Sequence, residues 1–186
     1  MKHVLIAGID TIVGGNLALA LSQQHRVTGL SSSRQVHIAN CHIEPIGQES
    51  SEDIRRRLAT SSPDLVVVCG PAAVPTWSAQ NSDGITSRNL QAAVRWASEV
   101  AQTNARLMVV SSDAVFHGPW MFHDEQCTGV CQSKQATAIR EMESQVLSCC
   151  PSALILRTQV FGWDPNPQGG WLEMLLEQLA DESPLA

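Results

Sequence analysis

The sequence predicts a doubly wound α/β domain, in which a parallel sheet carries helices on both faces. Short, almost purely apolar runs alternate with longer stretches whose apolar residues recur at helical spacing. A glycine-containing turn follows the first run, at residues 8–15. Strands that are apolar at every position are typical of a parallel sheet covered on both faces. Right-handed crossovers then give a doubly wound sheet, and we expect the first strand at its centre.

Six apolar runs are expected to form the strands. The clearest is LVVVC at residues 65–69, because five apolar residues, three of them valine, stand between Pro63 and Gly70. The stretch 36–46 is less regular, and we expect a short strand near its end. The predicted strands are 3–7, 26–30, 42–46, 65–69, 106–110 and 153–156.

The stretches between these runs are expected to form helices. The longest has apolar residues at helical spacing, among them Leu90, Ala93, Val94 and Ala97. The predicted helices are 13–24, 52–60, 83–102, 133–147 and 172–180.

Length and composition indicate one domain, which we place at residues 1–162. The chain has 186 residues, 44% of them hydrophobic, and a typical domain has about 150. A stretch rich in proline and glycine, GWDPNPQGG at 162–170, then leaves the sheet domain. The 16 residues after it are too few for a second domain.

Charge and cysteine usage exclude several classes of protein. A net charge of −6 disfavours nucleic acid as a partner, and no apolar run is long enough to span a membrane. The chain starts without a secretory signal pattern, so we expect a cytoplasmic protein with reduced thiols. None of the six cysteines has CxxC spacing, and we expect no metal site, although His117 and His123 lie near Cys127 and Cys131.

The turn after the first strand has the features of a dinucleotide-binding site. Gly8 and Gly14 keep the spacing of a nucleotide-binding turn, and Thr11 stands where the form GxxGxxG has its middle glycine. Glycine lets the backbone approach a pyrophosphate, and the next helix offers free N–H groups at its start. We expect the cofactor to contact Gly8, Thr11, Ile12 and Gly14. The alternative is a plain tight turn.

The end of the second strand favours NADP over NAD. An acidic residue there would bind the ribose 2′-hydroxyl of NAD. This chain instead has Ser31, Ser32 and Arg34, whose hydroxyls and guanidinium suit a 2′-phosphate. The alternative is a polar surface loop.

Several segments, in order, resemble a known family. They are the 8–14 turn, PDLVV at 63–67, Asn89, VSSDAVFHG at 110–118, Ser133-Lys134, and LRTQVFG at 156–162. The chain resembles an extended short-chain dehydrogenase/reductase, most of all the dTDP-4-dehydrorhamnose reductase group of nucleotide-sugar enzymes. That group shows runs such as STDYVFDG, YGxSK and LRxxxxYG. The resemblance implies a Rossmann-like domain that binds NAD(P), a nucleotide-sugar substrate, and a remnant of the substrate-binding region at residues 163–186.

The resemblance also assigns the candidate catalytic residues. It makes Ser112 the residue that hydrogen-bonds the substrate oxygen, Lys134 the lysine that binds the nicotinamide ribose, and Asn89 the family asparagine. Each has an alternative role: Ser112 caps a turn, Lys134 is an exposed helix residue, and Asn89 is on a solvent face. The family tyrosine lies four residues before the lysine, where this chain has Val130 and contains no tyrosine at all. Cys131 is a weaker candidate acid, because on a helix it would be rotated by about 100° from the required direction.

Two classes of function follow. In the first, the chain binds a dinucleotide but has impaired or absent catalysis, and acts as a sensor or a regulatory subunit with a protein partner or a second copy. In the second, it is an active nucleotide-sugar oxidoreductase or epimerase with another proton donor. A third reading is a fragment of a longer enzyme, which would explain the missing C-terminal segments but not Val130.

Overall fold

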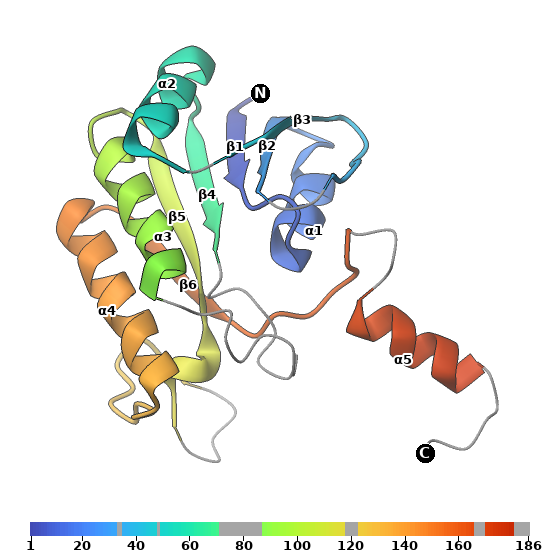
Figure 1. The fold of residues 1–186 in the computed structure, drawn as a ribbon, viewed down its shortest axis with the longest axis vertical. Helices are drawn as coiled ribbons and strands as arrows, with labels where there is room; N and C mark the ends of the chain where they lie inside the picture. Colours follow the sequence, from blue (N-terminus) through green and yellow to red (C-terminus); the bar gives the residue numbers. More distant parts are fainter. Residues whose placement is uncertain (33–34, 48, 71–86, 118–122, 166–169, 181–186) are drawn as a thin grey trace.

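The computed structural model describes residues 1–32, 35–47, 49–70, 87–117, 123–165 and 170–180. Within them the chain forms a six-stranded parallel sheet in the order β3-β2-β1-β4-β5-β6 (Figure 1). The strands are β1 (His3–Ala7), β2 (Arg26–Ser31), β3 (Cys41–Pro45), β4 (Leu65–Cys69), β5 (Arg106–Ser112) and β6 (Leu154–Thr158). This confirms the predicted doubly wound sheet, with the first strand at its centre.

The helices that connect these strands also lie close to their predicted positions. They are α1 (Ile12–Leu21), α2 (Ser51–Ser61), α3 (Ser87–Val100), α4 (Lys134–Cys149) and α5 (Trp171–Ala180). The predicted helix 83–102 was too long at its end, because residues 101–102 form a turn after α3; residues 83–86 lie outside the described part. A short 3₁₀ helix, η3 (Asp113–Val115), follows β5 directly.

Two apolar clusters hold helices against the two faces of the sheet. One joins α2, α3 and α4 to alternate strand residues, with the indole of Trp96 fully buried at its centre. The other joins α1 to the opposite face through residues such as Val4, Ile6 and Ala18. Figure 1 shows α2, α3 and α4 on one side of the strands and α1 on the other. Burial on both faces explains why the central strands β1 and β4 are almost wholly apolar.

After β6 the chain crosses to α1 before it reaches α5. The Asn16 side chain donates a hydrogen bond to the Trp163 carbonyl at 2.7 Å, so α1 holds this crossing segment. In Figure 1 the segment passes from the β6 side to the α1 side, and α5 lies apart from the strands. Residues 163–165 therefore pack on the sheet domain, although the predicted boundary falls at 162.

Within the described ranges, the helices are too short or too polar for any to cross a membrane.

Candidate functional site

The β1–α1 turn requires glycine at position 8. Gly8 has a φ of +86°, and a Cβ there would stand 2.2 Å from the carbonyl oxygen of Cys69. The backbone N–H groups of Gly8 and Ile9 donate to the Leu30 carbonyl at 2.9 and 3.1 Å. The turn thus lies directly against the ends of β2 and β4, at the point where the strand order reverses. In open α/β sheets this is where ligands bind.

The second glycine of the motif, Gly14, lets α1 start against this turn. A Cβ on Gly14 would stand 2.1 Å from the carbonyl oxygen of Gly8. Both glycines are therefore needed for the close approach of backbone to backbone, rather than for a turn of ordinary tightness.

Thr11 closes the turn from within and caps α1. Its hydroxyl donates to the Gly8 carbonyl at 2.7 Å and accepts from the Gly14 N–H at 3.0 Å. The bond from the Gly14 N–H occupies one amide of the helix start, and a glycine at position 11 would leave that amide available. The amides of Ile12 and Val13 also belong to the first turn, where a helix offers no internal acceptor, and this turn contains no acidic residue. These two amides can bind an anion.

Two acidic side chains that belong to no sequence motif lie at this end of the sheet. Asp10 is buried within the turn. Burial raises the pKa of the Glu49 carboxyl, and the nearby carboxylate of Asp10 raises it further, against the opposing effects of Arg95 and Trp96. The two carboxyl groups come from the first turn and from the segment before α2, so only the tertiary fold brings them together.

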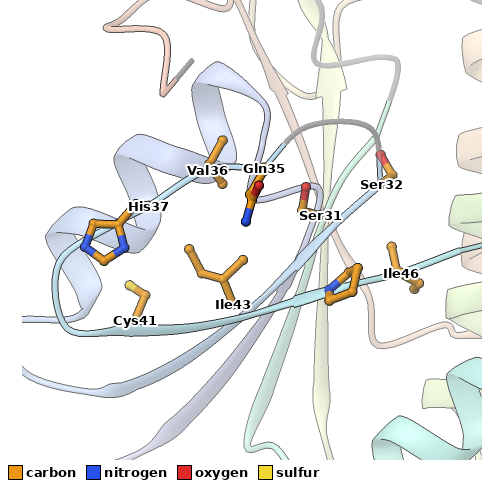
Figure 2. Close-up of a pocket in the computed structure, with 9 residues that line it drawn as sticks. Ser31, Ser32, Gln35, Val36, His37, Cys41, Ile43 and Ile46 are labelled. Carbon is orange, nitrogen blue, oxygen red and sulfur yellow. The ribbon is translucent and has the colours of Figure 1, made fainter. Parts of the chain in front are cut away.

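A pocket lies beside the end of β2. It encloses about 540 Å³ and is lined by Ser31, Ser32, Gln35, His37, Cys41 and neighbouring apolar residues. Figure 2 shows Ser31 and Gln35 close together on one side, and His37 and Cys41 on the other. Both predicted serines thus line one pocket. Arg34, the third residue of that prediction, lies outside the described residues.

Ser112 ends β5 with its side chain buried. Its hydroxyl oxygen accepts the N–H of Ala114 at 3.1 Å, which caps η3. This is the turn-capping role, the alternative to a substrate contact. A hydroxyl that accepts one bond still carries a proton to donate, so the two roles are compatible.

Lys134 and Val130 do not share a helix. Lys134 is the first residue of α4, capped by Ser133, and is exposed. Val130 precedes the helix and forms an isolated antiparallel bridge with Phe116. Cys131 also lies outside α4, so the argument from a 100° helical rotation was wrong: its N–H donates to the Val115 carbonyl instead. Asn89 lies on α3, and its side chain is outside what the structure describes.

The residues present fit a dinucleotide at the turn. Gly8 and Gly14 let the backbone pack closely at the turn, the first turn of α1 presents amides, and the Ser31–Ser32 pocket lies one strand away. Among the described residues, no group of three metal-ligating side chains converges here or elsewhere.

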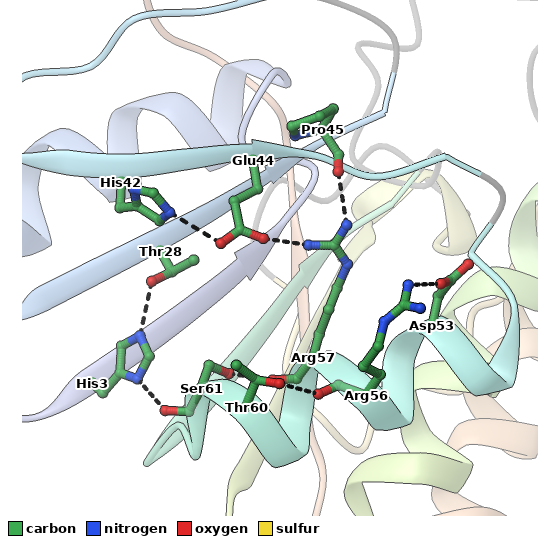
Figure 3. A network of polar contacts seen from close by, with 10 residues as sticks. All are labelled: His3, Thr28, His42, Glu44, Pro45, Asp53, Arg56, Arg57, Thr60 and Ser61. Atoms are coloured by element: carbon green, nitrogen blue, oxygen red, sulfur yellow. Dashed lines mark hydrogen bonds and ion pairs between the residues drawn. The ribbon is translucent and has the colours of Figure 1, made fainter.

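A second polar network is structural and joins α2 to the sheet: its His3 contacts lie at the start of β1, and its Arg57 contacts lie at the end of β3 (Figure 3). His3 contacts the Ser61 carbonyl at 2.8 Å through Nδ1 and the Thr28 hydroxyl at 2.9 Å through Nε2. Arg57 of α2 donates to the Glu44 carboxylate at 2.5 Å and to the Pro45 carbonyl at 2.8 Å, which joins α2 to β3.

This network predicts that stability falls in mild acid. Burial lowers the pKa of His3 below its usual value, so the folded protein takes up a proton less readily than the unfolded chain. The free energy of unfolding should therefore be highest above about pH 6.5 and fall as the pH drops through that value. Urea unfolding at several pH values tests this. His3→Gln should flatten the dependence, whereas the exposed His117→Gln should retain it; an unchanged slope in His3→Gln contradicts the assignment.

The comparisons with known proteins agree with this fold. A family model described as the RmlD substrate binding domain matches residues 1–185. A search of curated proteins finds no sequence that matches the chain.

Solved structures of nucleotide-sugar enzymes share the fold at low identity. A dTDP-4-dehydrorhamnose reductase from Clostridium acetobutylicum is 15% identical, with a TM-score of 0.67 over 96% of this chain and 60% of that one. The enzyme of the same name from Bacillus anthracis, in complex with NADP, is 15% identical, with a TM-score of 0.61 over 84% and 52%. UDP-glucuronic acid 4-epimerase from Bacillus cereus, in complex with UDP-glucuronic acid and NAD, is 15% identical, with a TM-score of 0.70 over 98% and 64%. The chain therefore spans between half and two thirds of these proteins.

Proposed function

This chain belongs to the RmlD substrate binding domain family, and we propose that it binds a nicotinamide dinucleotide at the β1–α1 turn. One observation carries the proposal: at Gly8 and Gly14 a Cβ would stand 2.2 and 2.1 Å from a backbone oxygen, directly before a helix start. A turn so tightly packed, at the strand-order switch point, suits a pyrophosphate. The dinucleotides named in the Bacillus structures support the same class of ligand.

Within this proposal, each end of the dinucleotide has its own residues. The Ile12 and Val13 amides would hold the pyrophosphate, and Ser31 and Ser32 would face the adenosine ribose. Arg34 follows these serines in the sequence, and we propose that it favours the 2′-phosphate of NADP. Asn89 and Lys134 would lie toward the nicotinamide half.

Isothermal titration calorimetry tests the binding directly. We expect heat with NADP, weaker heat with NAD, and heat with ADP-ribose, which keeps the pyrophosphate. Arg34→Ala should remove the preference for NADP while binding of NAD persists. Absence of heat with all three compounds at millimolar concentration would overturn the proposal.

We propose a nucleotide sugar as the second ligand. The epimerase from Bacillus cereus was solved with UDP-glucuronic acid, and two of the reported neighbours act on dTDP-4-dehydrorhamnose by name. In this proposal residues 163–186 begin the region that holds the sugar, and the six free cysteines suit a reducing, cytoplasmic setting.

We further propose that catalysis is impaired or absent. A bound nicotinamide dinucleotide supplies hydride chemistry, and the substrate oxygen then needs a proton from the protein. General acid help of this kind is worth about 10²–10⁴-fold in rate. Val130, at the family tyrosine position, has no proton to transfer, and the chain has no tyrosine. Ser112 can orient an oxygen, but an unactivated hydroxyl is a poor acid.

The prediction is negligible reduction of dTDP-4-keto sugars by the unmodified protein. NADPH oxidation, followed by absorbance, measures it, and Val130→Tyr is the variant that restores the missing group. Because Val130 precedes α4 instead of lying on it, we expect Val130→Tyr to raise the rate of NADPH oxidation only if Lys134 approaches the new hydroxyl. Turnover by the unmodified protein at an ordinary enzymatic rate of about 1 s⁻¹ would contradict the non-catalytic assignment and favour an active oxidoreductase or epimerase.

A further inference from the structure

The loop between η3 and α4 holds a cysteine and a histidine that the dinucleotide site does not use. Nδ1 of His123 lies 3.2 Å from Sγ of Cys127, so the thiol is placed to donate to the imidazole. Both residues are partly exposed. A thiol within hydrogen-bond reach of a base is the arrangement that activates a cysteine nucleophile.

Aromatic stacking fixes the imidazole of this pair. The rings of His123 and Phe116 are stacked, with centroids 4.5 Å apart and planes at 8°. Phe116 is itself held, because the guanidinium of Arg157 lies 5.1 Å over its ring and its backbone bridges to Val130. Arg157 in turn is anchored to the buried Glu143 by three hydrogen bonds. His123 is thus positioned by the Phe116 ring, which Arg157 and the buried Glu143 hold in turn.

The backbone of the loop is also tied to the sheet domain on the cysteine side. The His117 N–H donates to the Gly129 carbonyl at 2.8 Å, and the Cys131 N–H donates to the Val115 carbonyl at 2.9 Å. The Cys127 N–H closes a turn onto the Asp124 carbonyl. These bonds keep the thiol beside the imidazole.

We propose that Cys127 is a thiol-modification site that reacts with small disulfides, with His123 as its base. The thiol proton passes to Nδ1 of His123, and the sulfur attacks one sulfur of the disulfide. A new S–S bond forms, the old one breaks, and the departing thiolate takes up the proton to leave as a free thiol. The exposed Asp124 and Glu125 beside the pair favour a neutral or cationic disulfide over an anionic one.

Peptide mapping by mass spectrometry after brief exposure to 2,2′-dithiodipyridine tests this on the full chain. Cys149 is exposed at the end of α4, outside this loop, and serves as an internal reference. We expect Cys127 to react about tenfold faster than Cys149 at neutral pH, since the thiolate is the nucleophile. The anionic 5,5′-dithiobis(2-nitrobenzoic acid) should show a smaller ratio.

Two variants separate the role of the imidazole from that of the fold. His123→Phe retains a ring to stack on Phe116 and should bring the rate at Cys127 down to that at Cys149. His117→Phe, on an exposed histidine of the same loop, should leave the ratio unchanged. Circular dichroism verifies that both variants fold. A wild-type ratio near one, or an unchanged ratio in a folded His123→Phe protein, overturns the proposal. The readout needs no dinucleotide, so it is independent of the proposed function.

Discussion

Replacing Gly14 by alanine is expected to abolish dinucleotide binding and to destabilise the fold. The new Cβ would stand 2.1 Å from the Gly8 carbonyl oxygen, a backbone atom that cannot move without opening the turn. The first turn of α1 would then shift away from β1, together with the Ile12 and Val13 amides. Overpacking that forces backbone to shift typically costs about 1–3 kcal/mol, and occasionally more. Calorimetric titration and urea unfolding measure the two effects separately.

Gly47→Ala is the matched control, because a Cβ at Gly47 meets nothing within 4 Å. We expect its free energy of unfolding to stay within about 1 kcal/mol of the unmodified protein. Gly14→Glu adds a negative charge in the same place and should bind no more tightly than Gly14→Ala. Retained NADP affinity in a folded Gly14→Ala protein would show that the ligand binds elsewhere.

Removing the carboxylate of Glu143 is expected to lower the free energy of unfolding substantially. The carboxylate accepts from the buried Ser111 hydroxyl at 2.5 Å and from Arg157 at 2.7 Å. Glu143→Ala leaves the guanidinium and the hydroxyl without this partner beneath the β5–β6 edge. Loss of one member of a fully buried ion pair costs about 3–5 kcal/mol, and we expect a smaller loss here because the Arg157 side chain is 30% exposed. Chemical unfolding measures the difference in midpoint and free energy.

An exposed ion pair of the same type gives the comparison. Arg56 pairs with Asp53 on the surface of α2, and Arg56→Ala should cost about 1 kcal/mol or less. Equal decreases in the free energy of unfolding for Glu143→Ala and Arg56→Ala would be inconsistent with a buried Glu143 that anchors Arg157. Glu143→Ala should also loosen Phe116, because Arg157 lies over its ring. The reactivity of Cys127 then falls as a secondary effect.

The sequence by itself determined most of the secondary structure and predicted the candidate site at the first turn. Strands such as LVVVC at 65–69 are apolar on both faces, and this local pattern suffices to identify them. The glycines of the first turn were equally readable from their spacing, because Gly14 packs against the Gly8 carbonyl six residues earlier, whereas the contact between Gly8 and Cys69 depends on the tertiary fold. The absence of tyrosine was decisive for the catalytic prediction and needs no structure.

Tertiary structure decided the features that depend on contacts between distant segments. The α4 helix begins only at Lys134, which leaves Val130 and Cys131 in an extended segment bonded to the residues after β5. The Ser111–Glu143–Arg157 network and the stacked His123 join residues from β5, α4, β6 and a loop. Periodicity carries no signal for such contacts, because they arise only when the sheet brings the strand ends together.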